Sequence, residues 1–226
     1  MHQLSRIVLL LEQFLTTLKN IRWLKRNNMK RILWLLVFFS ALFWSLIKPH
    51  DLFTWLLEVF PALLGFIVLA KTYRTFPLTT LVYNLILLHS IILMVGGHYT
   101  YAEVPLFDWF KEWFGATRNN YDKLGHLAQG FVPLLIAREL VIRKQIIRGR
   151  AWQHFFCVCF CLAFSALYEL LEWAVALASG ESAEAFLGTQ GYIWDTQSDM
   201  FYALLGAMIS LLLLSRYHDK QLKQKI

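Results

Sequence analysis

The sequence has few charged residues. Lys, Arg, Asp and Glu make up 16% of its 226 residues, whereas soluble domains contain about 25%. Hydrophobic residues make up 58% of the chain. This balance argues against an ordinary cytosolic enzyme and predicts a protein that lies in a membrane.

Glycine, proline and cysteine are also scarce. With 11 glycines, 5 prolines and no internal repeat, the chain fits neither a collagen-like nor a low-complexity disordered class. On a helix, Cys157 and Cys161 share a face while Cys159 points elsewhere, so the three thiols cannot converge on one metal ion. We expect them to be structural.

The chain contains six apolar runs, most of them near the roughly 17 to 25 residues that cross a bilayer as a helix. They cover residues 32–47, 52–70, 78–96, 124–142, 155–178 and 200–215. The sequence therefore predicts an all-α polytopic bundle of six transmembrane helices over residues 32–215. We expect an amphipathic, basic cytoplasmic segment at residues 1–31 and a basic cytoplasmic tail at 216–226. No cleavable signal peptide is expected, and Met29 is an alternative start that the sequence leaves open.

The charges divide unequally between the two predicted faces of the membrane. The side that holds both termini carries 18 of the 22 Lys and Arg residues and three of the 15 Asp and Glu residues. By the positive-inside rule, both termini are cytoplasmic. Because topology accounts for the basic surface, we expect membrane lipids as partners and no nucleic acid.

Ionisable residues gather in the predicted outer half of the spans, although each costs roughly 2.5 to 3.5 kcal/mol at a helix centre. They are Glu58, His89, His126, Glu169, Glu172 and Asp199, with Asp195 one turn before the last. Lys123 is the only base that we place near a helix end in this half. We therefore expect protons, a metal ion or a cationic part of a substrate to neutralise these acids.

The spacing of these residues predicts that they converge. Three predicted helices each place two polar residues on one face, at i, i+3 or i, i+4. The pairs are Asp122 with His126, Glu169 with Glu172, and Asp195 with Asp199. Carboxylate and imidazole ligands suit Mg²⁺, Mn²⁺ or Zn²⁺. All six residues are candidate ligands of a divalent metal ion, and Glu169, Glu172 and His126 are candidate acid–base groups.

Simpler explanations exist for several of these residues. Asp122 and Asp195 are also typical of residues that cap a helix N-terminus. His126 could serve as an interhelical hydrogen-bonding residue, and Glu58 with His89 as a buried packing pair. The metal motif H-E-x-x-H is absent from the sequence.

Two further segments suggest local structure. Residues 104–114 are rich in aromatic side chains and predict a short amphipathic helix at headgroup level above the polar residues. Ala203, Gly206, Ala207 and Ser210 have the spacing of small residues at a helix–helix contact.

Four segments resemble a bacterial inner-membrane protein family of unknown function, the YjdF-type family. They are GGHYTY at 96–101, RNNYDKLGH at 118–126, YELLEW at 168–173 and GYIWDTQSD at 191–199. This resemblance implies a multi-pass protein of the bacterial inner membrane. More distantly, Asp122, Lys123, His126, Asp199 and Gly206 resemble the pattern of VanZ-like membrane proteins, which implies an envelope-facing role. The chain departs from that pattern at residue 203, where alanine replaces the usual asparagine.

These observations favour an extracytoplasmic pocket of acidic and histidine side chains. Such a pocket would bind or act on a lipid-linked or headgroup-level substrate with a divalent metal ion. One alternative is a proton- or cation-coupled transporter that uses Glu169, Glu172 and His89. Another is a non-catalytic partner in a membrane assembly.

Overall fold

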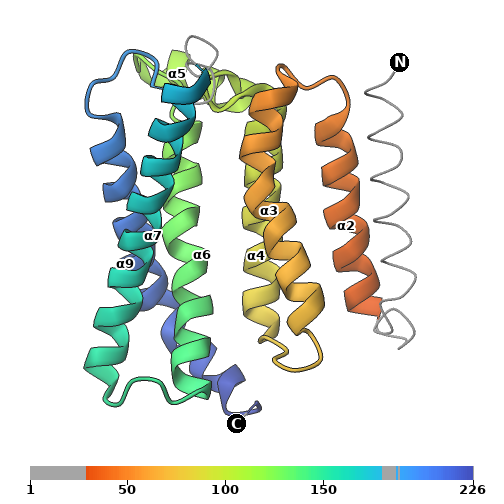
Figure 1. The fold of residues 1–226 in the computed structure, drawn as a ribbon, viewed down its shortest axis with the longest axis vertical. Helices are drawn as coiled ribbons and strands as arrows, with labels where there is room; N and C mark the ends of the chain where they lie inside the picture. The colour runs from red at the N-terminus through yellow and green to blue at the C-terminus, as the bar shows by residue number, and fades with distance from the viewer. Residues whose placement is uncertain (1–28, 180–186, 188, 226) are drawn as a thin grey trace. The chain divides into compact units, whose positions relative to one another are not determined.

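The computed structural model describes residues 29–179, 187 and 189–225 (Figure 1). The amphipathic segment expected at the N-terminus lies almost wholly outside these residues. Six long helices account for most of the described chain. They are α2 (Met29–Leu46), α3 (Leu52–Thr72), α4 (Thr80–Tyr99), α6 (Tyr121–Arg143), α7 (Arg150–Ser179) and α9 (Asp195–Leu222). Each is long and apolar enough to cross a membrane, and the described residues contain no strand, so the predicted all-α, six-span architecture is confirmed.

The last helix is longer than the apolar run that predicted it. The run begins at Met200, whereas α9 begins at Asp195 and continues to Leu222. Asp195 and Asp199 therefore lie within the first two turns of this helix, as their i, i+4 spacing predicts. This register places both carboxylates on a rigid element.

The chain divides into two compact units, residues 1–37 and 38–226. The described part of the first unit is the beginning of α2. In the second unit α6 is the most buried helix and packs against α9, α7 and α4.

Small residues bring α6 and α9 into backbone contact. A Cβ atom on Gly130 would overlap the carbonyl oxygen of Ala203, and one on Gly206 would overlap that of Leu127. The predicted helix–helix contact through small residues is confirmed. Because the backbones touch here, side chains at the ends of α6 and α9 are also held close together.

The cysteines behave as their spacing predicts. Cys157 and Cys161 are buried, whereas Cys159 is exposed. The two buried thiols pack with Leu134 and Ala207 in an apolar cluster between α6, α7 and α9. In this apolar cluster the two thiols pack as small hydrophobic side chains.

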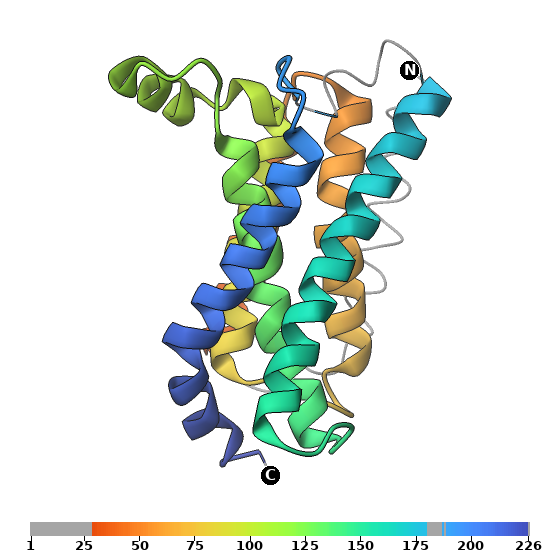
Figure 2. The same ribbon diagram turned by 90° about the vertical axis from the view of Figure 1, so that its left-hand side faces the viewer.

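The predicted amphipathic helix is present as α5 (Pro105–Phe114), after the one-turn 3₁₀ helix η2 (Tyr101–Glu103). Figure 2 shows α5 running crosswise to the spans and projecting to one side of the bundle, at the end where α6 begins. Its exposed apolar side chains include Trp109 and Trp113. Gly115 ends the helix in a left-handed conformation, with φ of 63°.

Candidate functional site

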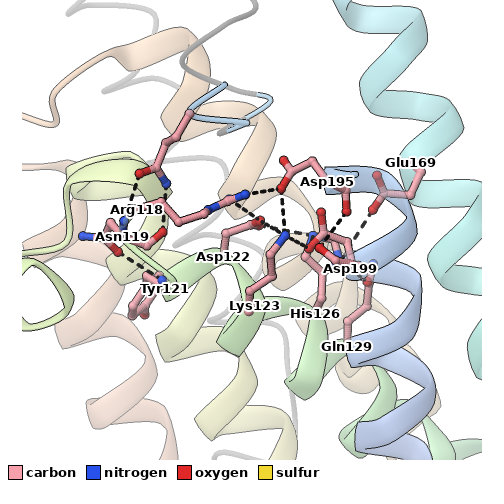
Figure 3. A network of polar contacts seen from close by, with 12 residues as sticks. Arg118, Asn119, Tyr121, Asp122, Lys123, His126, Gln129, Glu169, Asp195 and Asp199 are labelled. Carbon is pink, nitrogen blue, oxygen red and sulfur yellow. Dashed lines mark hydrogen bonds and ion pairs between the residues drawn. The ribbon is translucent and has the colours of Figure 1, made fainter. Parts of the chain in front are cut away.

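A cluster of buried polar side chains lies where α6 and α9 begin, against the C-terminal half of α7 (Figure 3). We call it the polar cluster. Its members are Arg118, Asp122, Lys123, His126, Glu169, Asp195 and Asp199. The structure therefore brings together five of the six candidate ligands, while Glu172 lines a neighbouring cavity.

His126 occupies the middle of the polar cluster. Its Nε2 lies 3.2 Å from Asp122 Oδ1 and 3.8 Å from Asp199 Oδ1. Its Nδ1 lies 2.9 Å from Gln129 Oε1 and 3.7 Å from Glu169 Oε1. An amide oxygen only accepts hydrogen bonds, so Nδ1 carries a hydrogen in this arrangement. Nε2 then faces two carboxylates, which requires either a proton or a metal ion on that nitrogen.

Lys123 joins the three aspartates. Its Nζ lies 2.5 Å from Asp199 Oδ1, 2.8 Å from Asp195 Oδ1 and 3.4 Å from Asp122 Oδ2. The side chain is 8% exposed, so these ion pairs are shielded from solvent. Buried pairs of this kind are held mainly by their geometry, because desolvation offsets much of the attraction.

Arg118 also contacts the polar cluster, which the sequence analysis missed. Its guanidinium lies 2.5 Å from Asp195 Oδ1 and 3.6 Å from Asp122 Oδ2. Lys123, the only base predicted near a helix end in this half, is therefore not the only base that pairs with these acids. Arg118 precedes α6 in a loop, so helical spacing gave no indication of where its side chain would lie.

The neighbouring residue Asn119 fixes the path of that loop. Its side-chain amide donates to the carbonyl oxygen of Val104 at 3.0 Å and to Asp108 at 2.9 Å. Its backbone N–H donates to the Gln190 side chain, which donates back to the Asn119 carbonyl oxygen. These contacts join α5, the loop before α6 and the loop before α9, and so hold the segment from which Arg118 reaches the polar cluster.

The two aspartates at the helix starts are not capping residues. The N-cap positions of α6 and α9 are Asn120 and Trp194, and neither side chain makes a capping hydrogen bond. Capping as an explanation for Asp122 and Asp195 is therefore wrong. Both still lie in the first helical turn, where the helix dipole favours negative charge.

Three members of the polar cluster have the spacing of a metal site. Asp122, His126 and Asp199 each offer one ligand atom, and these atoms lie within 4.8 Å of one another. In the described part of the chain no such group includes Glu169, Glu172 or Asp195. Glu169 lies next to this trio, and its buried Oε1 has no hydrogen-bond partner among the described residues.

A cavity of about 50 Å³ adjoins the polar cluster. Its lining residues are Glu58, Pro61, His89, Leu93, Tyr101, Asp122, Gly125, His126, Gln129, Phe164, Tyr168 and Glu172. The Tyr168 hydroxyl lies 3.5 Å from Glu58 Oε2. Glu58 and His89, which the sequence analysis weighed as a packing pair, thus face the same cavity.

Tyr101 forms a wall of this cavity because two glycines make room for its ring. A Cβ atom on Gly96 would overlap the ring, and one on Gly125 would lie 2.7 Å from it. Burial, and then the charge of Glu58, raise the pKa of Tyr101 well above its ordinary value. The hydroxyl therefore stays protonated. Sequence reasoning did not single out Tyr101, although Gly96 and Gly125 fall in the segments that carry the family resemblance.

A second buried polar cluster lies at the opposite ends of α6 and α9. Glu139 accepts hydrogen bonds from Thr79 N at 3.0 Å and from Thr79 Oγ1 at 2.9 Å, and it pairs with Arg143 at 2.7 Å. His218 Nε2 lies 3.2 Å from Glu139 Oε2, while Arg138 lies 3.2 Å from His218 Nδ1. Arginine only donates, so Nδ1 accepts and Nε2 donates to Glu139.

This second cluster ties α4, α6 and α9 together. Glu139 and His218 have hydrogen-bond partners within the cluster, which is typical of a structural network, although Arg138 Nε has none among the described residues. The sequence indicated Arg138, Glu139 and Arg143 only as charges on the predicted cytoplasmic side. The i, i+4 pair of Glu139 and Arg143 was the one local signal that could have indicated it.

Comparison with known proteins identifies the family. A family model described as "Predicted membrane protein (DUF2238)" matches residues 30–220. The chain belongs to this DUF2238 family. Inner membrane protein YjdF of Escherichia coli (strain K12) is 54% identical over 178 residues, which cover 79% of this chain and 85% of that protein. No solved structure matches the chain.

Membership confirms the resemblance to the YjdF-type family. Together with six apolar helices, it makes this DUF2238 protein a multi-pass protein of the inner membrane. Neither description names an activity. The function is therefore argued from the chemistry of the site.

Proposed function

We propose that this DUF2238 protein binds a divalent metal ion at Asp122, His126 and Asp199 and acts on a lipid-linked or headgroup-level substrate at the extracytoplasmic face. The observation that carries the proposal is the spacing of these three ligands, whose donor atoms lie within 4.8 Å of one another. Two carboxylates and one imidazole suit Mn²⁺, Zn²⁺ or Mg²⁺.

The surroundings of His126 support this assignment. Gln129 accepts a hydrogen bond from Nδ1 of His126. The other ring nitrogen, Nε2, then points toward Asp122 and Asp199. Metal-ligating histidines commonly donate their other ring N–H to an oxygen in this way, which fixes the tautomer and the ring orientation. The ammonium of Lys123 contacts Asp199, so metal binding would displace it from that oxygen.

Glu169 is placed to assist a reaction at the metal ion. It is buried beside His126, and its Oε1 lacks a hydrogen-bond partner among the described residues. A bound metal ion would polarise a phosphoryl or acyl oxygen or activate a water molecule. Glu169 would then accept or return the proton at that oxygen.

The depth of the site favours a substrate at headgroup level. Asp122 and Asp199 lie one and four residues into their helices, which is at most about 6 Å along each axis. The exposed aromatic side chains of α5 lie at the same end of the bundle. Such side chains are typical of the membrane–water interface.

The transporter alternative receives less support from the packing. The two polar clusters are 13 residues apart on α6, from His126 to Glu139, or about 20 Å. The apolar cluster that includes Leu134 and Ala207 lies between them on α6 and α9. A proton path along α6 would have to cross this layer.

The test is the metal content of the detergent-purified full chain after incubation with Mn²⁺ or Zn²⁺ and desalting. We expect about one ion per chain in the wild type and at least a tenfold lower content in Asp199→Asn and in His126→Gln. The control is the double variant His50→Ala, Glu103→Gln. This exposed histidine and carboxylate lie 3.4 Å apart at the same end of the bundle as the polar cluster.

A wild type that retains no metal ion, or a folded His126→Gln variant with full occupancy, would contradict the proposal. Monodisperse gel filtration and an unchanged unfolding temperature establish that a variant is folded. If neither the wild type nor any variant binds Mn²⁺ or Zn²⁺, support would shift to the transporter alternative.

A further inference from the structure

We infer that the cavity beside the polar cluster binds an organic ammonium group. Its volume is about 50 Å³, several times the roughly 10 to 15 Å³ that one water molecule needs. The space therefore suits a group of a few heavy atoms.

The charges around the cavity call for a cation. Glu58, Asp122 and Glu172 line it, and none of the lining residues is Lys or Arg. Asp122 is already paired with Arg118, Lys123 and His126. Among the described residues, no ion pair joins either of the other two carboxylates to a basic side chain, although His126 lines the same cavity; Glu58 contacts the Tyr168 hydroxyl.

Glu172 is the clearest example of a carboxylate without a basic partner. Its residue is 9% exposed, its side chain lines the cavity, and no hydrogen bond or ion pair joins it to any other described residue. A buried carboxylate without a partner is costly, so a ligand that supplies a positive charge and N–H or N–CH₃ groups would stabilise it.

The lining favours an organic cation over a metal ion. The group of described residues that has the spacing of a metal site contains neither Glu58 nor Glu172, so these two carboxylates are not part of a three-ligand metal site. Tyr101, Tyr168 and Phe164 add aromatic rings to the same cavity. Aromatic rings attract ammonium groups through their negative faces, and alkylated ammonium groups are commonly bound in this way.

This inference deepens the proposed function, since it gives the headgroup-level substrate a cationic nitrogen beside the metal trio. The inference rests on the proposed function only where it calls the bound ammonium compound a substrate. The same ammonium chemistry is available from a phospholipid headgroup and from a soluble amine, and the experiment distinguishes these sources.

The experiment is a thermal unfolding titration of the detergent-purified full chain with choline chloride and ethanolamine hydrochloride, against NaCl at equal ionic strength. Native mass spectrometry of the same preparation compares retention of phosphatidylethanolamine and phosphatidylglycerol. We expect the wild type to be stabilised by an amine or to retain phosphatidylethanolamine selectively. We expect Glu172→Gln and Glu58→Gln to weaken that binding at least tenfold.

The matched control is Glu103→Gln, which removes an exposed carboxylate and should bind as the wild type does. A response to free amines assigns the ligand to a soluble source, and selective retention of phosphatidylethanolamine alone assigns it to the lipid headgroup. Both results support the inference. Stabilisation by NaCl equal to that by the amines with no lipid selectivity, or unchanged binding in both folded glutamine variants, would overturn it.

Metal content separates this inference from the proposed function. Glu172→Gln should lose ammonium binding while it keeps its bound Mn²⁺, because Glu172 is not one of the three ligands. Ammonium binding in a wild type that holds no metal ion would leave the inference standing and the metal-dependent function rejected.

Discussion

At the scale of single residues, the site depends on how each polar side chain is oriented. His126 contacts carboxylates from three helices, and Gln129 determines which ring nitrogen faces which of them. The sequence predicted the partners within one helix, such as Asp122 and His126, because helical spacing fixes them. It could not predict Arg118, whose position depends on the tertiary contacts of Asn119.

Replacement of Gln129 by leucine should weaken metal binding without removing a ligand. The buried Nδ1–H of His126 would lose its acceptor, so the ring would no longer be held toward Asp122 and Asp199. We expect about a 10- to 100-fold loss of Mn²⁺ affinity, measured by competition with a chelator. Gln153→Leu is the control, since Gln153 bonds a carbonyl oxygen at the opposite end of the bundle. Equal affinities in both variants would contradict the role of Gln129.

Asp51 gives a pH-dependent contribution to stability. It caps α3, which carries Glu58, by accepting a hydrogen bond from Thr54 N at 2.6 Å, and this bond lowers the pKa of Asp51. A lowered folded-state pKa stabilises the protein above the unfolded-state pKa, and the contribution is lost as pH falls through the folded-state value. Asp51→Ala should reduce the free energy of unfolding by about 1 kcal/mol at pH 7.

The difference between wild type and Asp51→Ala should shrink when unfolding is measured at acidic pH rather than at pH 7, because the contribution is lost as the pH falls through the lowered folded-state pKa. Asp51→Asn is the matched control, because asparagine caps a helix without titrating. A difference that stays constant between the two pH values would show that the charge of Asp51 is not involved.

At the scale of helices, the apolar runs predicted the number and approximate place of the spans because each run must cover the hydrocarbon core. The helix ends were less predictable from the apolar runs, since α9 (Asp195–Leu222) extends beyond the run at 200–215 at both ends. Contacts between distant helices were not predictable from local spacing. Glu139 and His218, for example, are 79 residues apart in sequence and meet only because α6 and α9 pack backbone to backbone.

That backbone contact can be tested with a single methyl group. Gly206→Ala places a Cβ atom against the backbone of Leu127, whereas Gly65 on α3 has nothing within 4 Å of the same position. We expect Gly206→Ala to lower the free energy of unfolding by about 1 to 3 kcal/mol. Gly65→Ala should leave it unchanged or raise it by about 0.5 to 1 kcal/mol, because alanine favours the helix. Thermal unfolding in one detergent compares them, and equal effects would contradict the close contact of α6 and α9.

At the scale of the whole molecule, charge asymmetry predicts which end of the bundle faces outward. Six spans place the two ends of the described helical region on the same side of the membrane, and the positive-inside rule predicts that this side is cytoplasmic. The polar cluster then faces outward, at the end of the bundle where α6 and α9 begin.

Reporter fusions test this orientation. Alkaline phosphatase, which is active only outside the cytoplasm, should be active when fused after Ala116 and inactive when fused to the C-terminus. Green fluorescent protein should fluoresce at the C-terminus. The reverse pattern would place the polar cluster on the cytoplasmic side and reject an outer-leaflet substrate.

The most direct test of the central claim is electron spin echo spectroscopy of the Mn²⁺-loaded protein, because it detects nitrogen bonded to the metal ion. We predict ¹⁴N modulation from one imidazole, abolished in His126→Gln and unchanged in the His50→Ala, Glu103→Gln control. Bound Mn²⁺ without nitrogen modulation, or with modulation that persists in folded His126→Gln, would contradict a metal site at Asp122, His126 and Asp199.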